Sequence, residues 1–263
     1  MRGDALRDHL IGVYTCYGRR KCDLAVLTAY LDESGIHQGD HLCVVAGWVG
    51  SEAEWLPFIQ PWMTALGRRH NLHMKELRWN QHPERVGNLL ARLGPIPENC
   101  GLRPVYGGIW QRDYEAIVKG RVKETFTSPY MLAAQRCIAA ALHSMGATSE
   151  RIGFVFDNQE LYKDRIARLE KVVFQTAKVD TRVNGISFMK RESTVCLDPA
   201  DYLAFQLREY NTDKASTKSR LGMSIFGKNA GHGFGIGHID SPDELQRMVG
   251  LLRHFGYYAE AEQ

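Results

Sequence analysis

Three acidic residues stand at the ends or borders of apolar segments, where a buried carboxylate is costly unless it is paired. Asp32 ends an apolar run over residues 24–31, Asp157 ends another over residues 151–156, and Asp201 borders the apolar stripe of a predicted helix. Converging carboxylates repel one another unless cations neutralise them, and their oxygens are preferred ligands of Mg²⁺ and Mn²⁺. Paired divalent ions activate a water and stabilise the leaving oxygen in phosphodiester cleavage. These three acids are the candidate metal ligands and catalytic residues.

Two further acids are candidates for a fourth position. Side chains alternate along a strand, so Asp32 and Glu33 cannot both point into one site unless the strand has already turned, and we rank Asp32 first. His73 and Glu76 are three residues apart and would share one face of a helix, as a ligand pair or as an exposed polar pair. The candidate catalytic set therefore also includes Glu33 and Glu76.

Each acid also has an ordinary structural interpretation. A strand that ends in an acidic turn accounts for Asp32 or Asp157, and a negative charge near a helix N-terminus is favourable for Asp201 by less than about 1 kcal/mol. Asp198 and Pro199 suit the N-cap and the first position of that helix. Convergence of the three acids would separate the metal site from these interpretations.

Apolar strand patterns separated by amphipathic helix patterns predict an α/β domain. The expected strands cover residues 24–31, 41–49, 103–110, 151–157 and 185–189. Helices are expected over residues 52–69, 83–93 and 160–177, from Pro129 and from Asp198 onward, and at the C-terminus after Ser241. This order predicts a mixed sheet of about five strands flanked by helices.

The remaining segments are expected to be irregular. Residues 1–23 lack periodicity and end in a basic cluster, which predicts a flexible basic leader before a single domain over residues 24–263. Residues 211–237 are rich in glycine and predict a mobile loop before the C-terminal helix. A strand before this loop and a helix start directly after it are both missing from the pattern, so it is not a phosphate-binding fingerprint.

Composition favours a cytoplasmic protein with no membrane partner. The 263 residues include 44% hydrophobic residues and six scattered cysteines, and no apolar run approaches the roughly 18 residues that would span a membrane. The net charge of +3 does not require an anionic partner. Residues 161–193 nevertheless carry eight Lys or Arg against four acids, which could follow a phosphate backbone and make nucleic acid the expected partner.

Five motifs together resemble the domain of unknown function 3800 family, and the resemblance covers roughly residues 25–210. The motifs are Tyr30-Leu31-Asp32-Glu33-Ser34-Gly35, Ala46-Gly47, His73 with Glu76, Phe154-Val155-Phe156-Asp157 and Pro199-Ala200-Asp201-Tyr202-Leu203-Ala204. That family is similar to ribonuclease H-like nucleases and integrases. The resemblance implies a ribonuclease H-like sheet with Asp32 on the first strand, Asp157 on the fourth and Asp201 on a helix. One departure is Asp198, where the family often carries glutamine.

The leading hypothesis is a phosphodiesterase that depends on Mg²⁺ or Mn²⁺ and acts on DNA or RNA. The alternative is a catalytically silent ribonuclease H-like module that binds nucleic acid or protein through its basic surface. Hydrolysis of a small nucleotide is a third option, which acids in a closed pocket rather than an open groove would favour. The arrangement of the three carboxylates in space distinguishes the first hypothesis from the second.

Overall fold

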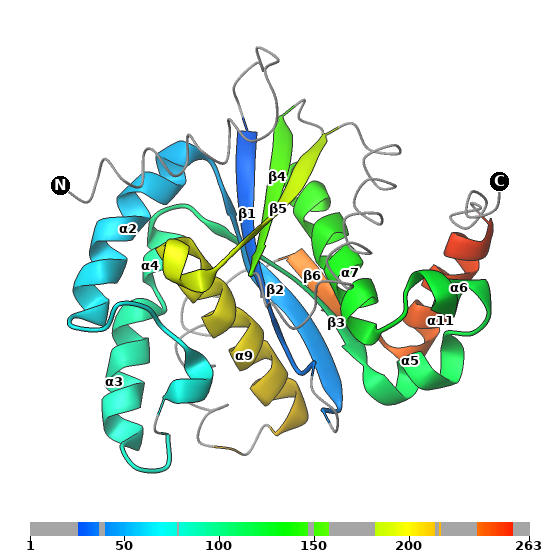
Figure 1. Cartoon of the computed structure of the whole chain (residues 1–263), viewed down its shortest axis with the longest axis horizontal. Coiled ribbons are helices and arrows are strands. Elements are labelled where there is room, and N and C mark those ends of the chain that lie inside the picture. Colours follow the sequence, from blue (N-terminus) through cyan, green and yellow to red (C-terminus); the bar gives the residue numbers. More distant parts are fainter. Residues whose placement is uncertain are drawn as a thin grey trace.

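The computed structural model describes residues 26–36, 40–77, 79–146, 150–157, 182–213, 216 and 236–254. These residues form an α/β domain in which a six-stranded mixed sheet is flanked by helices (Figure 1). The strands are β1 (Val26–Ser34), β2 (Leu42–Gly50), β3 (Arg103–Trp110), β4 (Arg151–Asp157), β5 (Val183–Met189) and β6 (Ile236–Ile239). The predicted fold class is therefore confirmed at the level of a mixed α/β sheet.

The sheet has the order β5-β4-β1-β2-β3-β6. Strand β1 pairs with β2 in antiparallel orientation and β2 with β3 likewise, whereas the pairs β1 with β4, β4 with β5, and β3 with β6 are parallel. The first two strands of the chain are thus antiparallel neighbours. The two strands that end in acids, β1 and β4, lie side by side and run in the same direction.

Helices cover both faces of the sheet. Helix α9 contacts β1 and β2 on one face, where α2 and α3 join it, and α7 contacts β2, β3 and β6 on the other face, near α5, α6 and α11. Their bounds are α2 (Glu52–Leu66), α3 (Pro83–Leu93), α4 (Ile96–Asn99), α5 (Gln111–Ile117), α6 (Arg121–Thr125), α7 (Pro129–Ser144), α9 (Asp198–Thr212) and α11 (Pro242–His254), with 3₁₀ turns η1 (Met74–Glu76), η3 (Arg191–Ser193) and η4 (Val195–Leu197).

Alternation along the strands decides which side chains meet which helices. Leu31 and Phe156 belong to the hydrophobic core on the α7 face, whereas Tyr30 and Val155 belong to the core on the α9 face. The parallel register pairs Leu31 with Phe156, so the next residue of each strand lies on the α9 face beside its neighbour. The sheet therefore brings Asp32 and Asp157 together on the face that α9 covers.

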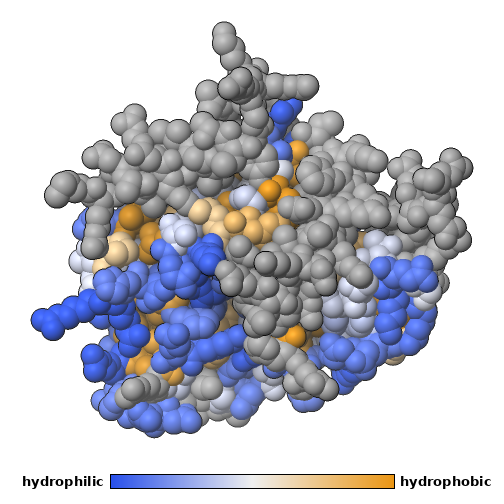
Figure 2. Space-filling model, in the orientation of Figure 1, coloured by the Kyte–Doolittle hydropathy of each residue, from blue (hydrophilic) through white to orange (hydrophobic). Residues whose placement is uncertain are grey.

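The outer surface of α3 and of the α5–α6 segment is polar. Helix α3 buries Val86, Leu89, Leu90 and Leu93 and leaves most of its other side chains exposed or partly exposed. Figure 2 shows hydrophilic residues over α3 and over the α5–α6 segment on the face in view. Within the described part of the chain, no helix combines the length and the apolar character needed to cross a membrane.

Three expectations about the elements need correction or lie outside the described residues. The sheet has a sixth strand, β6, whose first two residues fall in the segment expected to be a mobile loop, and the register with β3 is what makes this segment a strand. Pro57 and Pro61 lie inside the predicted helix 52–69 and indicate a bend or a break there, but α2 continues past both to Leu66. The leader 1–23, the helix 160–177 and the loop residues 217–235 lie outside the described residues.

We expect Gly107→Ala to lower the free energy of unfolding by about 1–3 kcal/mol, because α7 packs directly on β3 at this point. A Cβ on Gly107 would lie 2.4 Å from the carbonyl oxygen of Ala133 and 2.7 Å from the backbone nitrogen of Cys137. Gly153→Ala on β4 is the matched control, since a Cβ there meets nothing within 4 Å. Urea unfolding of the two variants gives the comparison, and equal stabilities would contradict the close approach of α7.

Candidate metal centre

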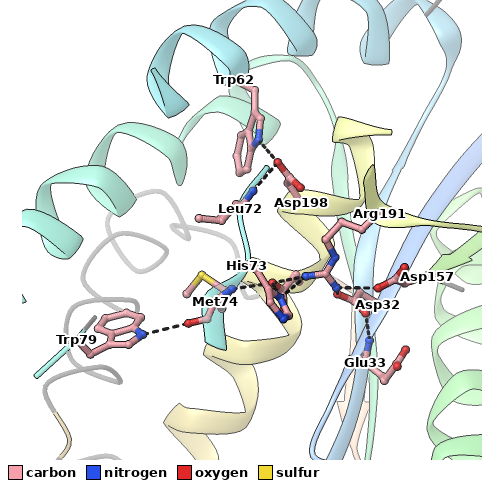
Figure 3. A network of polar contacts seen from close by, with 11 residues as sticks. Asp32, Glu33, Trp62, Leu72, His73, Met74, Trp79, Asp157, Arg191 and Asp198 are labelled. Atoms are coloured by element: carbon pink, nitrogen blue, oxygen red, sulfur yellow. Dashed lines mark hydrogen bonds and ion pairs between the residues drawn. The ribbon is translucent and has the colours of Figure 1, made fainter. Parts of the chain in front are cut away.

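The structure brings the three predicted acids together. Asp32 near the end of β1, Asp157 at the end of β4 and Asp201 in the first turn of α9 converge on the α9 face of the sheet, where each contacts Arg191. Figure 3 shows Asp32 and Asp157 there. Asp32 is fully buried and Asp201 is 4% exposed, whereas Asp157 is partly buried. The convergence on which the metal hypothesis depends is therefore present.

One buried arginine lies among these carboxylates. Arg191, on η3, donates from Nη2 to Oδ2 of Asp157 at 2.9 Å and from Nη1 to Oδ2 of Asp201 at 2.7 Å, and Nη2 also pairs with Oδ2 of Asp32. Figure 3 shows the guanidinium beside Asp32 and Asp157. Because a guanidinium carries five N–H donors in a fixed plane, one side chain satisfies one oxygen of each acid.

His73 completes the centre on the Asp201 side. Its Nδ1 lies 3.1 Å from Oδ2 of Asp201 and 2.5 Å from Nη1 of Arg191. A guanidinium only donates, so Nδ1 either accepts from Arg191 or donates to Asp201, and cannot do both at once. The backbone N–H of Met74 also donates to the same oxygen of Asp201, at 2.8 Å.

The pKa values in the centre follow from burial and from these contacts. Burial raises the pKa of Asp32 well above its usual range, although the charge of Arg191 opposes the shift. Burial also pushes the pKa of Asp201 upward, but the hydrogen bond from His73, the charge of Arg191 and the N–H of Met74 outweigh it and lower that pKa. Burial lowers and the three carboxylates raise the pKa of Arg191, with a net rise, so its guanidinium stays charged.

Glu33 and Glu76 lie differently from the three acids. Glu33 donates its backbone N–H to Oδ1 of Asp32 at 2.8 Å, while Figure 3 shows its carboxylate pointing away from Arg191, as strand alternation predicts. Burial, followed by the charge of Asp157, raises the pKa of Glu33 to about 8. Glu76 is exposed on η1, whereas His73, its partner in the proposed pair, lies against Asp201.

Asp198 has a different role from the predicted N-cap. The N-cap of α9 is Leu197, and Asp198 is the first helical residue, with its side chain fully buried. Its Oδ2 accepts hydrogen bonds from Nε1 of Trp62 at 3.2 Å and from the backbone N–H of Leu72 at 3.0 Å. The prediction was wrong because these distant donors hold the carboxylate more effectively than the adjacent helix N–H groups.

Asp198 and Asp201 together fix one segment of chain against α9. The alternate backbone N–H groups of Leu72 and Met74 donate to Asp198 and Asp201 respectively, and His73 between them reaches Asp201 with its ring. This pairing aligns residues 72–74 with the first turn of α9. It places the imidazole at the edge of the carboxylate cluster.

Arg191 is the functional residue that sequence reasoning missed. It was grouped with the basic residues expected to follow a phosphate backbone, but it is 8% exposed and faces inward. Of the eight, Lys163, Arg165, Arg168, Lys171 and Lys178 lie outside the described residues. The position of Arg191 could have indicated its role. It follows β5, and the end of β5 pairs with the end of β4 at Asp157.

The donor set suits a hard divalent cation, but Arg191 lies at its centre. The three carboxylates supply only oxygen ligands, which is the chemistry that Mg²⁺ and Mn²⁺ prefer. Among the residues that the structure describes, no group of three or more His, Cys, Asp or Glu is arranged to hold a metal ion as it stands. The types of ligand therefore suit a divalent metal ion, but in this structure the carboxylates surround the guanidinium of Arg191.

A separate cavity of about 640 Å³ lies near the end of β1 and the start of α7. Its lining includes Gly35, Cys43, Tyr114 and Ser128, and none of the three acids contributes to it. The third hypothesis, hydrolysis of a small nucleotide, predicted the three acids in a closed pocket. This cavity does not contain them.

No family model matches the chain, and no curated protein matches it either. The resemblance to the domain of unknown function 3800 family stays a prediction.

We expect the Asp198 carboxyl to make the protein less stable as pH rises. Burial raises its pKa to about 7, against an ordinary 3.8, even though the hydrogen bonds from Leu72 and Trp62 oppose the shift. The folded state therefore holds this proton more tightly than the unfolded state, so its contribution is greatest below about pH 4 and is lost by about pH 7.

Asp198→Asn removes this ionisation while keeping an acceptor for both donors. We expect the fall in unfolding free energy between pH 4 and pH 8 to be smaller in the variant, by on the order of a few kcal/mol. Thermal unfolding across that range measures it, with exposed Asp243→Asn as the control. Parallel pH profiles for wild type and Asp198→Asn would show that this carboxyl keeps its usual pKa.

Proposed function

We propose that the protein is a divalent-metal-dependent phosphodiesterase of ribonuclease H-like fold that acts on DNA or RNA. The observation that carries the proposal is the convergence of Asp32, Asp157 and Asp201, from two strands and a helix, within contact of a single cationic group. The mixed sheet with helices on both faces is compatible with that fold.

The charge of the site supports a requirement for added cations. Three acids face one guanidinium, so the cluster carries an excess of negative charge when all three acids are ionised. Such a cluster repels a phosphodiester backbone, and burial strengthens the repulsion because the surroundings screen it poorly. A nucleic acid substrate would approach this centre only after further positive charge had entered it.

The protein's own groups hold the acids ready for this role. Glu33 N–H fixes Oδ1 of Asp32, and Met74 N–H fixes Oδ2 of Asp201, so both carboxylates have set orientations. Asp157 is the most exposed of the three acids. A bound Mg²⁺ or Mn²⁺ would supply the activation of water and the neutralisation of the leaving oxygen.

A catalytically silent module is the second candidate, and Arg191 is the observation that favours it. The guanidinium already pairs with all three acids, so the cluster has a cation without any metal. In that case the protein would bind nucleic acid or another protein through its surface, and the cluster would serve the fold alone.

We expect Asp157→Asn to reduce cleavage of nucleic acid by on the order of 100-fold or more, because it removes a metal ligand. Labelled single-stranded and duplex DNA and RNA are incubated with and without Mn²⁺ and resolved on gels. Asp157 is partly buried, so its replacement perturbs folding less than that of Asp32, and Asp32→Asn serves as a second variant. Circular dichroism checks that both variants are folded.

Asp243→Asn is the matched control, since Asp243 is exposed on α11 and we expect full activity from it. If wild type cleaves nucleic acid and Asp157→Asn cleaves it at the same rate, the assignment of Asp157 as a metal ligand is refuted. Binding of the labelled strands with no Mn²⁺-dependent cleavage by wild type would favour the silent module.

A further inference from the structure

We infer that Arg191 and the divalent cation exchange for the same three carboxylates, so that Arg191 must leave its position before a metal can bind. The inference deepens the proposed function and rests on it. It makes Arg191 an internal competitor that sets how tightly the protein binds metal.

The contacts place the guanidinium where a shared metal would lie. Nη2 touches Oδ2 of both Asp32 and Asp157, and Nη1 touches Oδ2 of Asp201, so each acid directs one oxygen to the same group. A metal ligated by all three acids would need these convergent oxygens. Two buried cations side by side would repel strongly, so the two occupants exclude each other.

Arg191 cannot vacate the cluster by losing its charge. An arginine side chain stays protonated in proteins, so it has to move as a cation. Lys190, Glu192 and Ser193, beside Arg191, are exposed, so the segment that carries the guanidinium lies at the surface. The three acids lie on β1, β4 and α9, so a rotation of the Arg191 side chain toward solvent leaves the cluster itself in place.

The contact with His73 makes the present position of Arg191 less favourable. Its Nδ1 lies within contact of both Arg191 and Asp201 and can serve only one of them. When Arg191 leaves, Nδ1–H donates to Asp201 without a competing donor. The departure of the guanidinium therefore relieves one unfavourable contact, which offsets part of the loss of its ion pairs.

Competition has a measurable consequence for metal affinity. A site that is competent only when Arg191 has left binds metal with an affinity reduced by the fraction of time it is competent. Removing the guanidinium therefore raises the apparent affinity. We expect Arg191→Gln to bind Mn²⁺ at least about tenfold more tightly than wild type.

The experiment titrates Mn²⁺ into the full chain and follows free Mn²⁺ by electron paramagnetic resonance, with no nucleic acid present. Arg208→Gln is the matched control, because Arg208 also contacts two carboxylates, those of Asp40 and Glu209, which lie outside the cluster. We expect Arg208→Gln to bind as wild type does. Asp32→Asn should bind Mn²⁺ weakly, which locates the metal at the three acids.

Arg191→Lys keeps the experiment decisive if Arg191→Gln does not fold. Lysine retains the positive charge that the buried acids need, but its single ammonium group matches three carboxylates less well than a guanidinium. We expect Arg191→Lys to bind Mn²⁺ more tightly than wild type and less tightly than Arg191→Gln. Affinity in folded Arg191 variants that equals or falls below that of wild type would overturn the exchange.

The outcomes separate this inference from the proposed function. In one outcome, wild type binds Mn²⁺, Asp32→Asn binds it more weakly and Arg191→Gln binds it no more tightly. That result supports the metal site and refutes the competition by Arg191. If Arg191→Gln binds tightly, the exchange holds whether or not nucleic acid is cleaved. An absence of Mn²⁺ binding by every variant would overturn both the exchange and the metal-dependent phosphodiesterase.

Discussion

The contact of one guanidinium with three buried carboxylates is the interaction on which the centre of this structure depends. A buried charge without a partner costs far more than a surface ion pair contributes, so Asp32 and Asp201, when ionised, need a cation beside them in the folded state. Arg191 supplies it from η3, directly after the edge strand β5. Residues from β1, β4 and α9 meet at this one side chain.

The rest of the fold supports that arrangement from two directions. The parallel register of β1 and β4 places their acids side by side, and α7 packs on the opposite face of the sheet. On the α9 face, two indoles bind the start of the helix, because Nε1 of Trp48 donates to the carbonyl of Pro199 and Nε1 of Trp62 donates to Asp198. The first turn of α9, and Asp201 with it, is held by contacts far apart in sequence.

Local patterns predicted the acids but not their counter-ion. Asp32 and Asp157 each follow an apolar run of strand length, and alternation along β1 correctly separated Asp32 from Glu33. Arg191 carries no such pattern, because its partners are set by the order of β5, β4 and β1 in the sheet, which periodicity does not encode. For the same reason β6 went unpredicted, since its pairing with β3 depends on where the chain returns to the sheet.

Asp198 shows a different limit of local reasoning. An aspartate before Pro199 at a helix start favours an N-cap, and that inference uses only neighbouring residues. The chain instead uses the carboxylate to bind Leu72 and Trp62, and so ties residues 72–74 to α9. A cap satisfies one helix end, whereas this contact also positions His73 beside Asp201. Tertiary donors decided the outcome, and no spacing in the sequence indicates them.

A purely structural role for the cluster leaves its composition unexplained. Apolar residues of similar volume commonly replace a buried ion pair with no loss of stability, so ionic groups are a costly way to fill a core. Here the imbalance adds to that cost, because three carboxylates meet one guanidinium and repel one another. If the cluster served only to stabilise the folded state, one acid would be enough to neutralise Arg191. The surplus of acids is what a centre that binds a cation of higher charge requires, and it favours the metal-dependent function over the silent module.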